Sequence, residues 1–128
     1  MAGGEGFVAV FDSGLGGISV LRRLVDALPH EDFVYVGDSA HNPYGERSPR
    51  QILSLSRQIV GGLVREGAKA VVIACNTATS VAAATLRREL PTLPIVGVEP
   101  ALKPATEHDP HSRILVMATP VTLRLDKY

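Results

Sequence analysis

The stretch Val71-Val72-Ile73-Ala74-Cys75-Asn76-Thr77-Ala78-Thr79 (VVIACNTAT) passes from apolar residues to small polar ones. Its first half is an uninterrupted apolar run, which is typical of a parallel strand covered on both faces. Its second half leads into residues 78–90, a segment that we expect to be helical and to stop before Pro91. The stretch therefore predicts a buried strand that runs directly into a helix, with the only cysteine of the chain at the junction.

The same alternation extends over the rest of the chain. Short apolar segments predict five strands, at residues 7–11, 33–36, 70–74, 94–98 and 114–118. Helical spacing of apolar residues predicts a helix over residues 18–28 and another that begins after Ser48. Ser48 is a good N-cap, Gln51 can complete a capping box, and Gly67 lies where a C-terminal cap belongs. The pattern predicts an α/β fold, an open and mostly parallel sheet with flanking helices and right-handed crossovers.

Length and composition fit one ordinary globular domain. The chain has 128 residues, of which 45% are hydrophobic and 20% charged. Thirteen basic residues balance thirteen acidic ones, which argues against binding to nucleic acid or to an anionic membrane. Residues 1–6 lack the features of a signal peptide, and one cysteine cannot form an internal disulfide or a structural zinc site. We therefore expect a cytoplasmic protein without a metal.

Polar residues follow each predicted strand. In an open α/β sheet, ligands bind beyond the carboxyl ends of the strands, so these positions are the candidate site. The residues concerned are Asp12-Ser13-Gly14, Gly37-Asp38-Ser39, Cys75-Asn76-Thr77, Glu99-Pro100 and Thr119-Pro120.

Cys75 admits two interpretations. A lone cysteine is often a small buried hydrophobic residue. At the start of a helix, however, the positive end of the helix dipole and nearby backbone N–H groups stabilise a thiolate. Such a thiolate can act as a base as well as a nucleophile.

The glycine-rich turn from Asp12 to Gly17 is the second candidate. It can be a simple turn in which Asp12 or Ser13 caps the following helix. A nucleotide-binding loop is less consistent with the residues, because Ser19 occupies the third fingerprint position and Asp12 would repel a pyrophosphate. The remaining interpretation is a loop that grips a substrate carboxylate while Asp12 meets a cationic or proton-bearing group.

Residues 38–48 (DSAHNPYGERS) form a connection longer than a βα loop requires. It can be an exposed surface loop with turn residues. Long loops at the carboxyl edge of a sheet also carry binding groups, and Tyr44 with the neighbouring backbone is the best candidate here. We expect His41 to be solvated rather than catalytic.

Four motifs follow one another along the chain: FDSGLGGISVLR, GDSAHNPYGERS, ACNTATSVA and PIVGVEPALKPA. In this order they resemble the amino-terminal half of the glutamate racemase family, a group of cofactor-independent enzymes related to aspartate racemases. The resemblance extends from Val8 to Tyr128. It implies an isomerase that interconverts L- and D-glutamate for peptidoglycan synthesis, with no cofactor, and it allows a homodimer for a full-length enzyme.

The resemblance also implies roles for individual residues. Members of the family use two cysteines on opposite faces of the substrate, and Cys75 corresponds to one of these acid/base groups. Asp12 corresponds to a residue that assists proton transfer. The positions that correspond to substrate-binding residues are Asp12, Ser13, Tyr44, Gly45, Asn76, Thr77 and Thr119.

The chain departs from the family pattern because it has no second cysteine. Its last residues, 124–128, are expected to lie in the first helix after the fifth strand. Residues 104–113 are polar and interrupted by proline, as in a linker. We therefore expect residues 1–98 to form a truncated first lobe, and residues 99–128 to form the crossover and the start of a second lobe.

Two other functions remain open. One is a related decarboxylase or isomerase that uses a single cysteine on a small dicarboxylate. The other is a ligand-binding module without catalytic activity.

Overall fold

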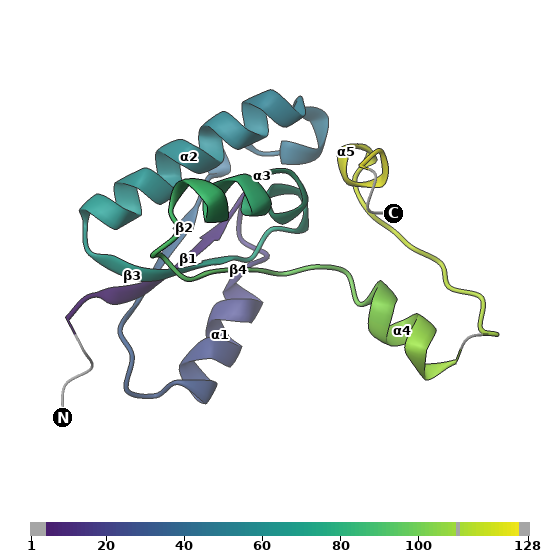
Figure 1. Ribbon diagram of the computed structural model, residues 1–128, viewed down its shortest axis with the longest axis horizontal. Coiled ribbons are helices and arrows are strands. Elements are labelled where there is room, and N and C mark those ends of the chain that lie inside the picture. The colour runs from purple at the N-terminus through teal and green to yellow at the C-terminus, as the bar shows by residue number, and fades with distance from the viewer. Residues whose placement is uncertain (1–4, 110, 126–128) are drawn as a thin grey trace.

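The computed structural model describes residues 5–109 and 111–125. Its centre is a sheet of four parallel strands in the order β2-β1-β3-β4 (Figure 1). The strands are β1 (Phe7–Asp12), β2 (Phe33–Gly37), β3 (Ala68–Ile73) and β4 (Ile95–Gly97). The predicted open parallel α/β sheet is confirmed for the first four of the five expected strands.

Helices cover both faces of the sheet. Helix α1 (Ile18–Ala27) lies on one face, and α2 (Pro49–Arg65) and α3 (Asn76–Glu89) lie together on the other (Figure 1). Two short 3-10 helices, η1 (Ser39–His41) and η2 (Tyr44–Glu46), lie in the connection from β2 to α2. Helix α4 (Leu102–His108) extends away from the sheet, and the chain then returns so that α5 (Pro120–Leu123) contacts α3 and η2 (Figure 1).

Strand β1 separates two apolar layers, because successive side chains of a strand point to opposite faces. Ala9 and Phe11 belong to the larger layer beneath α2 and α3. Val8 and Val10 belong to the smaller layer against α1. Burial on both faces explains why residues 7–11 of β1 form an unbroken apolar run in the sequence.

The local signals for α2 are confirmed in detail. Ser48 Oγ accepts a hydrogen bond from Gln51 N–H at 3.2 Å, and Gln51 Oε1 accepts one from Ser48 N–H at 3.0 Å, which completes the capping box. Past the other end, Gly67 has a φ of +104°, a conformation that glycine adopts without strain. Both ends of α2 are therefore set by nearby residues.

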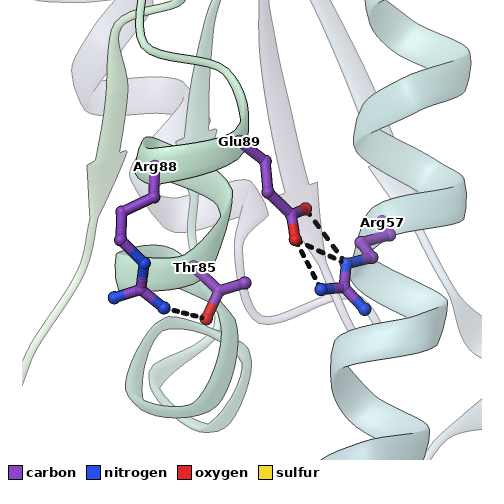
Figure 2. Close-up of polar contacts among 4 residues, drawn as sticks. All are labelled: Arg57, Thr85, Arg88 and Glu89. Carbon is purple, nitrogen blue, oxygen red and sulfur yellow. Dashed lines mark hydrogen bonds and ion pairs between the residues drawn. The ribbon is translucent and has the colours of Figure 1, made fainter.

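An ion pair joins α2 to α3 on the surface. Arg57 donates to both carboxylate oxygens of Glu89, with Nε 3.0 Å from Oε2, while Arg88 donates to Thr85 on α3 (Figure 2). The hydrogen bond from Arg57 lowers the pKa of Glu89. Both partners of the ion pair are about half exposed, so solvent screening leaves it a minor contributor to stability.

The expected fifth strand at residues 114–118 was wrong. Residues 113–119 have no regular secondary structure, and the side chains of Leu115 and Met117 are both 86% exposed. A strand requires a neighbour with which to exchange backbone hydrogen bonds, and none of the described strands pairs with this segment.

Two smaller expectations also differ from the structure, and a third lies partly outside the described residues. The linker-like segment 104–113 begins inside helix α4, which continues to His108. Helix α3 begins at Asn76 rather than at residue 78, because Cys75 itself is the N-cap. The expected helix over residues 124–128 extends past the described residues, since positions 126–128 lie outside them, and the described helix α5 ends at Leu123.

At Gly97, strand β4 packs closely against helix α3. A Cβ atom at this position would lie 2.3 Å from Cγ2 of Thr79, a side chain that is 1% exposed and cannot move aside. We expect Gly97→Ala to lower the free energy of unfolding by about 1–3 kcal/mol through overpacking. Urea unfolding of the wild type and the variant measures this change.

Gly61 in α2 provides the control. A Cβ atom there would lie 3.5 Å from Nη1 of Arg65, an ordinary contact, so Gly61→Ala should stabilise the helix by about 0.5–1 kcal/mol. Equal unfolding midpoints for the two variants would contradict the packing argument.

Candidate active site

The ends of β1 and β3 bring Asp12 and Cys75 to the same edge of the sheet. Phe11 pairs with Ile73 in the parallel register, and the N–H of Ala74 donates to the carbonyl of Phe11 at 2.7 Å. The next residues along each strand therefore leave the sheet side by side. This follows from parallel pairing, which places all carboxyl ends of the strands at one edge.

Cys75 lies at the junction of β3 and α3 and is 7% exposed. Its Sγ accepts a hydrogen bond from the backbone N–H of Ala78 at 3.4 Å and lies 3.5 Å from Oγ of Ser13. The sulfur thus occupies the N-cap position, where helix N–H groups and the helix dipole favour a negative charge. This geometry suits a thiolate held at the start of a helix.

The carboxylate of Asp12 is buried, with 6% of the residue exposed. Its Oδ2 accepts a hydrogen bond from the N–H of Gly17 at 2.9 Å and lies 3.4 Å from the hydroxyl of Tyr35. Burial, followed by the charge of Asp12, raises the pKa of Tyr35, so this hydroxyl stays protonated. A Cβ atom at Gly17 would lie 2.8 Å from Cβ of Asp12, so only glycine permits this close turn around the carboxylate.

Three threonine hydroxyls connect α3 to α5. Oγ1 of Thr77 lies 3.0 Å from Oγ1 of Thr119, which lies 3.0 Å from Oγ1 of Thr122. Thr77 and Thr122 are buried, whereas Asn76 at the start of α3 is exposed. The segment after residue 118 therefore supplies hydroxyl groups to the edge where Cys75 lies.

These groups surround a cavity of about 440 Å³. The cavity is not enclosed and opens to solvent. The predicted site residues that line it are Asp12, Cys75, Asn76, Thr77 and Thr119. The other lining residues include Ala74, Val98, Pro100, Met117 and Thr122.

The three remaining predicted residues lie around this cavity without lining it. Ser13 contacts the thiol of Cys75. Tyr44 is 2% exposed, its ring packs at a tilt on Phe11, and burial followed by a hydrogen bond to Asp38 raises the pKa of its hydroxyl. Gly45 packs against Thr119, since a Cβ atom at Gly45 would lie 2.8 Å from Cγ2 of that threonine.

The sequence analysis did not select Tyr35 or Thr122, and it named Asp38 only as one of the residues that follow the second strand. Tyr35 reads as one more aromatic residue of an apolar strand, and nothing in its neighbours shows that its hydroxyl reaches Asp12. Asp38 directly follows β2, and Asp12 is the last residue of β1; this recurrence of an aspartate at the carboxyl end of both strands was the available signal. Thr122 lies one helical turn after Thr119, a spacing that brings both hydroxyls together only once α5 forms.

Two further observations concern residues 5–109 and 111–125. Within these ranges no group of three or more His, Cys, Asp or Glu side chains could hold a metal ion. Nor does any helix there have the length and apolar character needed to cross a membrane.

No protein-family profile matches the chain. Individual proteins do match it. Over 121 residues the chain is 51% identical to a glutamate racemase of Clostridium perfringens, an alignment that covers 94% of this chain and 46% of that protein. The chain thus spans about half the length of the curated relatives it matches.

Solved structures agree with the sequence matches. A glutamate racemase of Campylobacter jejuni superimposes with a TM-score of 0.81 at 33% identity, over 91% of this chain and 48% of that one. The Escherichia coli glutamate racemase, solved with L-glutamate and the activator UDP-MurNAc-ala, superimposes with a TM-score of 0.74 at 39% identity, over 80% and 38% of the two chains. The resemblance expected from the four motifs is confirmed.

Proposed function

We propose that this chain, a homologue of the amino-terminal portion of glutamate racemases, forms one half of a site that interconverts L- and D-glutamate. The observation that carries the proposal is the position of the Cys75 thiol. It lies at the start of α3, on a cavity also lined by Asp12, Asn76, Thr77 and Thr119. In this proposal residues 1–98 form a first lobe, and residues 99–128 lead into a second.

The chemistry requires a base at contact distance from the α-carbon. The thiolate of Cys75 takes the α-proton and becomes a thiol, and the electron pair of the broken C–H bond delocalises into the α-carboxylate. Hydrogen-bond donors prepared for that growing charge lower the barrier. The N–H groups of the first turn of α3, together with the hydroxyls of Thr77 and Thr119, are suited to this task.

The other residues have supporting roles. The buried Asp12 assists proton transfer at the ammonium end of glutamate, and Ser13 holds the sulfur of Cys75 and contacts a carboxylate. The segment that carries Tyr44 and Gly45 closes the side of the site next to Thr119. No cofactor takes part in the proposed reaction.

Inversion needs a second acid/base on the opposite face, where a proton is returned to the carbanion. The chain has one cysteine, so we propose that this second group lies outside these 128 residues and that the chain alone does not invert glutamate. In the cell, the complete enzyme would act in the cytoplasm, as a homodimer, to supply D-glutamate for peptidoglycan. The presence of one cysteine also fits a one-cysteine decarboxylase or isomerase of a small dicarboxylate, which is the alternative function.

Alkylation of Cys75 tests the proposal. Because the chain has one cysteine, every alkylated molecule reports on that residue. We expect iodoacetamide to react with the folded protein at neutral pH, since the helix start favours the reactive thiolate, and we expect L- or D-glutamate to slow the reaction. Mass spectrometry of samples taken over time gives the rates.

Two controls complete the measurement. Succinate, a dicarboxylate without an ammonium group, should protect less than glutamate. Protein unfolded in urea gives the rate of the free thiol. If the cysteine reacts only after unfolding, Cys75 is a core residue. If it reacts in the folded protein but glutamate leaves the rate unchanged, glutamate does not bind beside it. Either result contradicts the proposed function.

A further inference from the structure

Asp38, the residue that follows β2, accepts a hydrogen bond at each of its carboxylate oxygens. The hydroxyl of Tyr44 donates to Oδ2 at 2.7 Å, and Nδ1 of His41 donates to Oδ1 at 2.8 Å. The backbone N–H of Asp38 also donates to the carbonyl of Asp12 at 2.9 Å. The Asp38 side chain is 10% exposed and its bond to Tyr44 is partly buried, whereas His41 is 48% exposed and its bond faces solvent. Asp38 therefore connects the loop of residues 38–48 to the strand end that carries Asp12.

The bond to Asp38 determines what the Tyr44 hydroxyl can do. Its one proton is committed to Asp38, so the hydroxyl is not free to donate to a substrate carboxylate. The charged groups around it are Asp38, Cys75 and Arg47; burial and the two acidic groups raise its pKa, and Arg47 lowers it. The hydroxyl thus stays neutral, within electrostatic reach of the thiol.

From Tyr44 the contacts continue toward the cavity. The ring is buried against Phe11, and the next residue, Gly45, lies so close to Thr119 that a Cβ atom there would be 2.8 Å from Cγ2 of the threonine. Thr119 in turn lies 3.0 Å from Thr77, at the start of α3. An uninterrupted series of contacts thereby leads from Asp38 to two hydroxyls that line the cavity.

We propose that Asp38 is a positioning residue of the glutamate site. Its carboxylate fixes the Tyr44 side chain, and through Tyr44 and Gly45 it holds Thr119 against Thr77 beside Cys75. The inference rests on the proposed function for the identity of the ligand, whereas the positioning itself is a property of the ligand-free chain. Asp38 acts through Tyr44 and does not touch the substrate.

The experiment compares the whole chain in four forms: wild type, Asp38→Asn, Tyr44→Phe and the double variant. The first readout is the alkylation rate of Cys75 by iodoacetamide without ligand. We expect each single variant to raise the rate several-fold, because the cover over the buried thiol loosens. The double variant should match Tyr44→Phe, which already lacks the hydrogen bond, whereas Asp38→Asn keeps at most a weaker neutral one; the two changes are therefore not additive.

The second readout is the glutamate concentration that halves the alkylation rate. We expect it to rise about ten-fold in both single variants, as for loss of a hydrogen bond to a charged group, while saturating glutamate still protects fully. Asp26→Asn, the same change at an exposed position of α1, should leave both readouts unchanged. Val60→Ala, a destabilised variant with a smaller core side chain in α2, separates the effect of global stability from that of the loop.

Each outcome has a distinct meaning. If glutamate fails to protect the wild type, the proposed function fails, and the ligand-free rates still decide the role of Asp38. If the wild type is protected and Asp38→Asn behaves like it, the positioning role is overturned. The positioning role is also overturned if the alkylation rates of Val60→Ala and Asp38→Asn simply follow their thermal stabilities. Additive effects of Asp38→Asn and Tyr44→Phe on the alkylation rate would overturn it as well.

Discussion

In heavy water, the 128-residue chain should exchange the α-proton of glutamate slowly and should not convert one enantiomer into the other. The reason is geometric. Inversion requires a proton to leave one face of the α-carbon and another to arrive on the opposite face, and a single thiol reaches only one face. After Cys75 has taken the proton and exchanged it with solvent, it returns deuterium to the face from which the proton came.

The open cavity makes even this exchange slow. Water that enters the cavity weakens the electrostatic stabilisation of the developing carbanion. By resemblance to the family, D-glutamate should be the enantiomer that exchanges. Proton NMR of the α-position measures exchange, and circular dichroism of the same samples measures inversion.

Cys75→Ala is the matched control for this prediction, because it removes the thiol and adds no bulk at the start of α3. We expect it to abolish exchange while the protein stays folded. Conversion of L- to D-glutamate by the wild-type chain at an ordinary enzymatic rate, roughly 1–10³ per second, would show that these residues contain both acid/base groups. That conversion would contradict the half-site proposal.

The second large effect is expected for Asp12→Asn in a full-length protein that carries this half-site. The carboxylate lines the cavity beside Cys75, and its hydrogen bonds to Gly17 and Tyr35 both use Oδ2. An asparagine keeps an oxygen for these two donors, so the turn into α1 should persist while the negative charge is lost. We expect kcat to fall about 100-fold or more, with little change in KM, as for loss of a group that acts in proton transfer.

Steady-state kinetics and thermal unfolding together check this prediction. The unfolding temperature of Asp12→Asn should stay close to that of the wild type, because the packing around Gly17 is unchanged. Tyr35→Phe is the companion variant: it removes the hydroxyl and keeps the carboxylate charge, and it should cost less activity than Asp12→Asn. An unchanged kcat in Asp12→Asn would leave the carboxylate as a cap for the start of α1.

Features set by neighbouring residues could be predicted from the sequence. The limits of α2 follow from Ser48, Gln51 and Gly67, which act within one turn of the helix ends. The first four strands follow from apolar runs, because a parallel strand buried on both faces admits few polar residues. The side-by-side placement of Asp12 and Cys75 also follows, since parallel strands end at a common edge.

Other features depended on which segments meet in three dimensions. Residues 114–118 have the composition of a strand, yet no described strand pairs with them, and composition carries no information about a missing neighbour. The sequence shows Tyr35 within a strand and Tyr44 within a long loop, but not which groups their hydroxyls contact. Only the tertiary structure directs the Tyr35 hydroxyl to the Gly14 carbonyl beside Asp12, and the Tyr44 hydroxyl to Asp38.

The sequence by itself determined the parallel α/β sheet and the group of polar residues at its carboxyl edge, because both depend on short-range periodicity and on the common direction of the strands. The tertiary structure alone decided how those polar residues are used. In it the Tyr44 hydroxyl donates to Asp38, the hydroxyls of Thr119 and Thr77 are in contact, and Gly45 packs against Thr119. These contacts join residues from six to more than seventy positions apart, and their geometry exists only once the elements have packed.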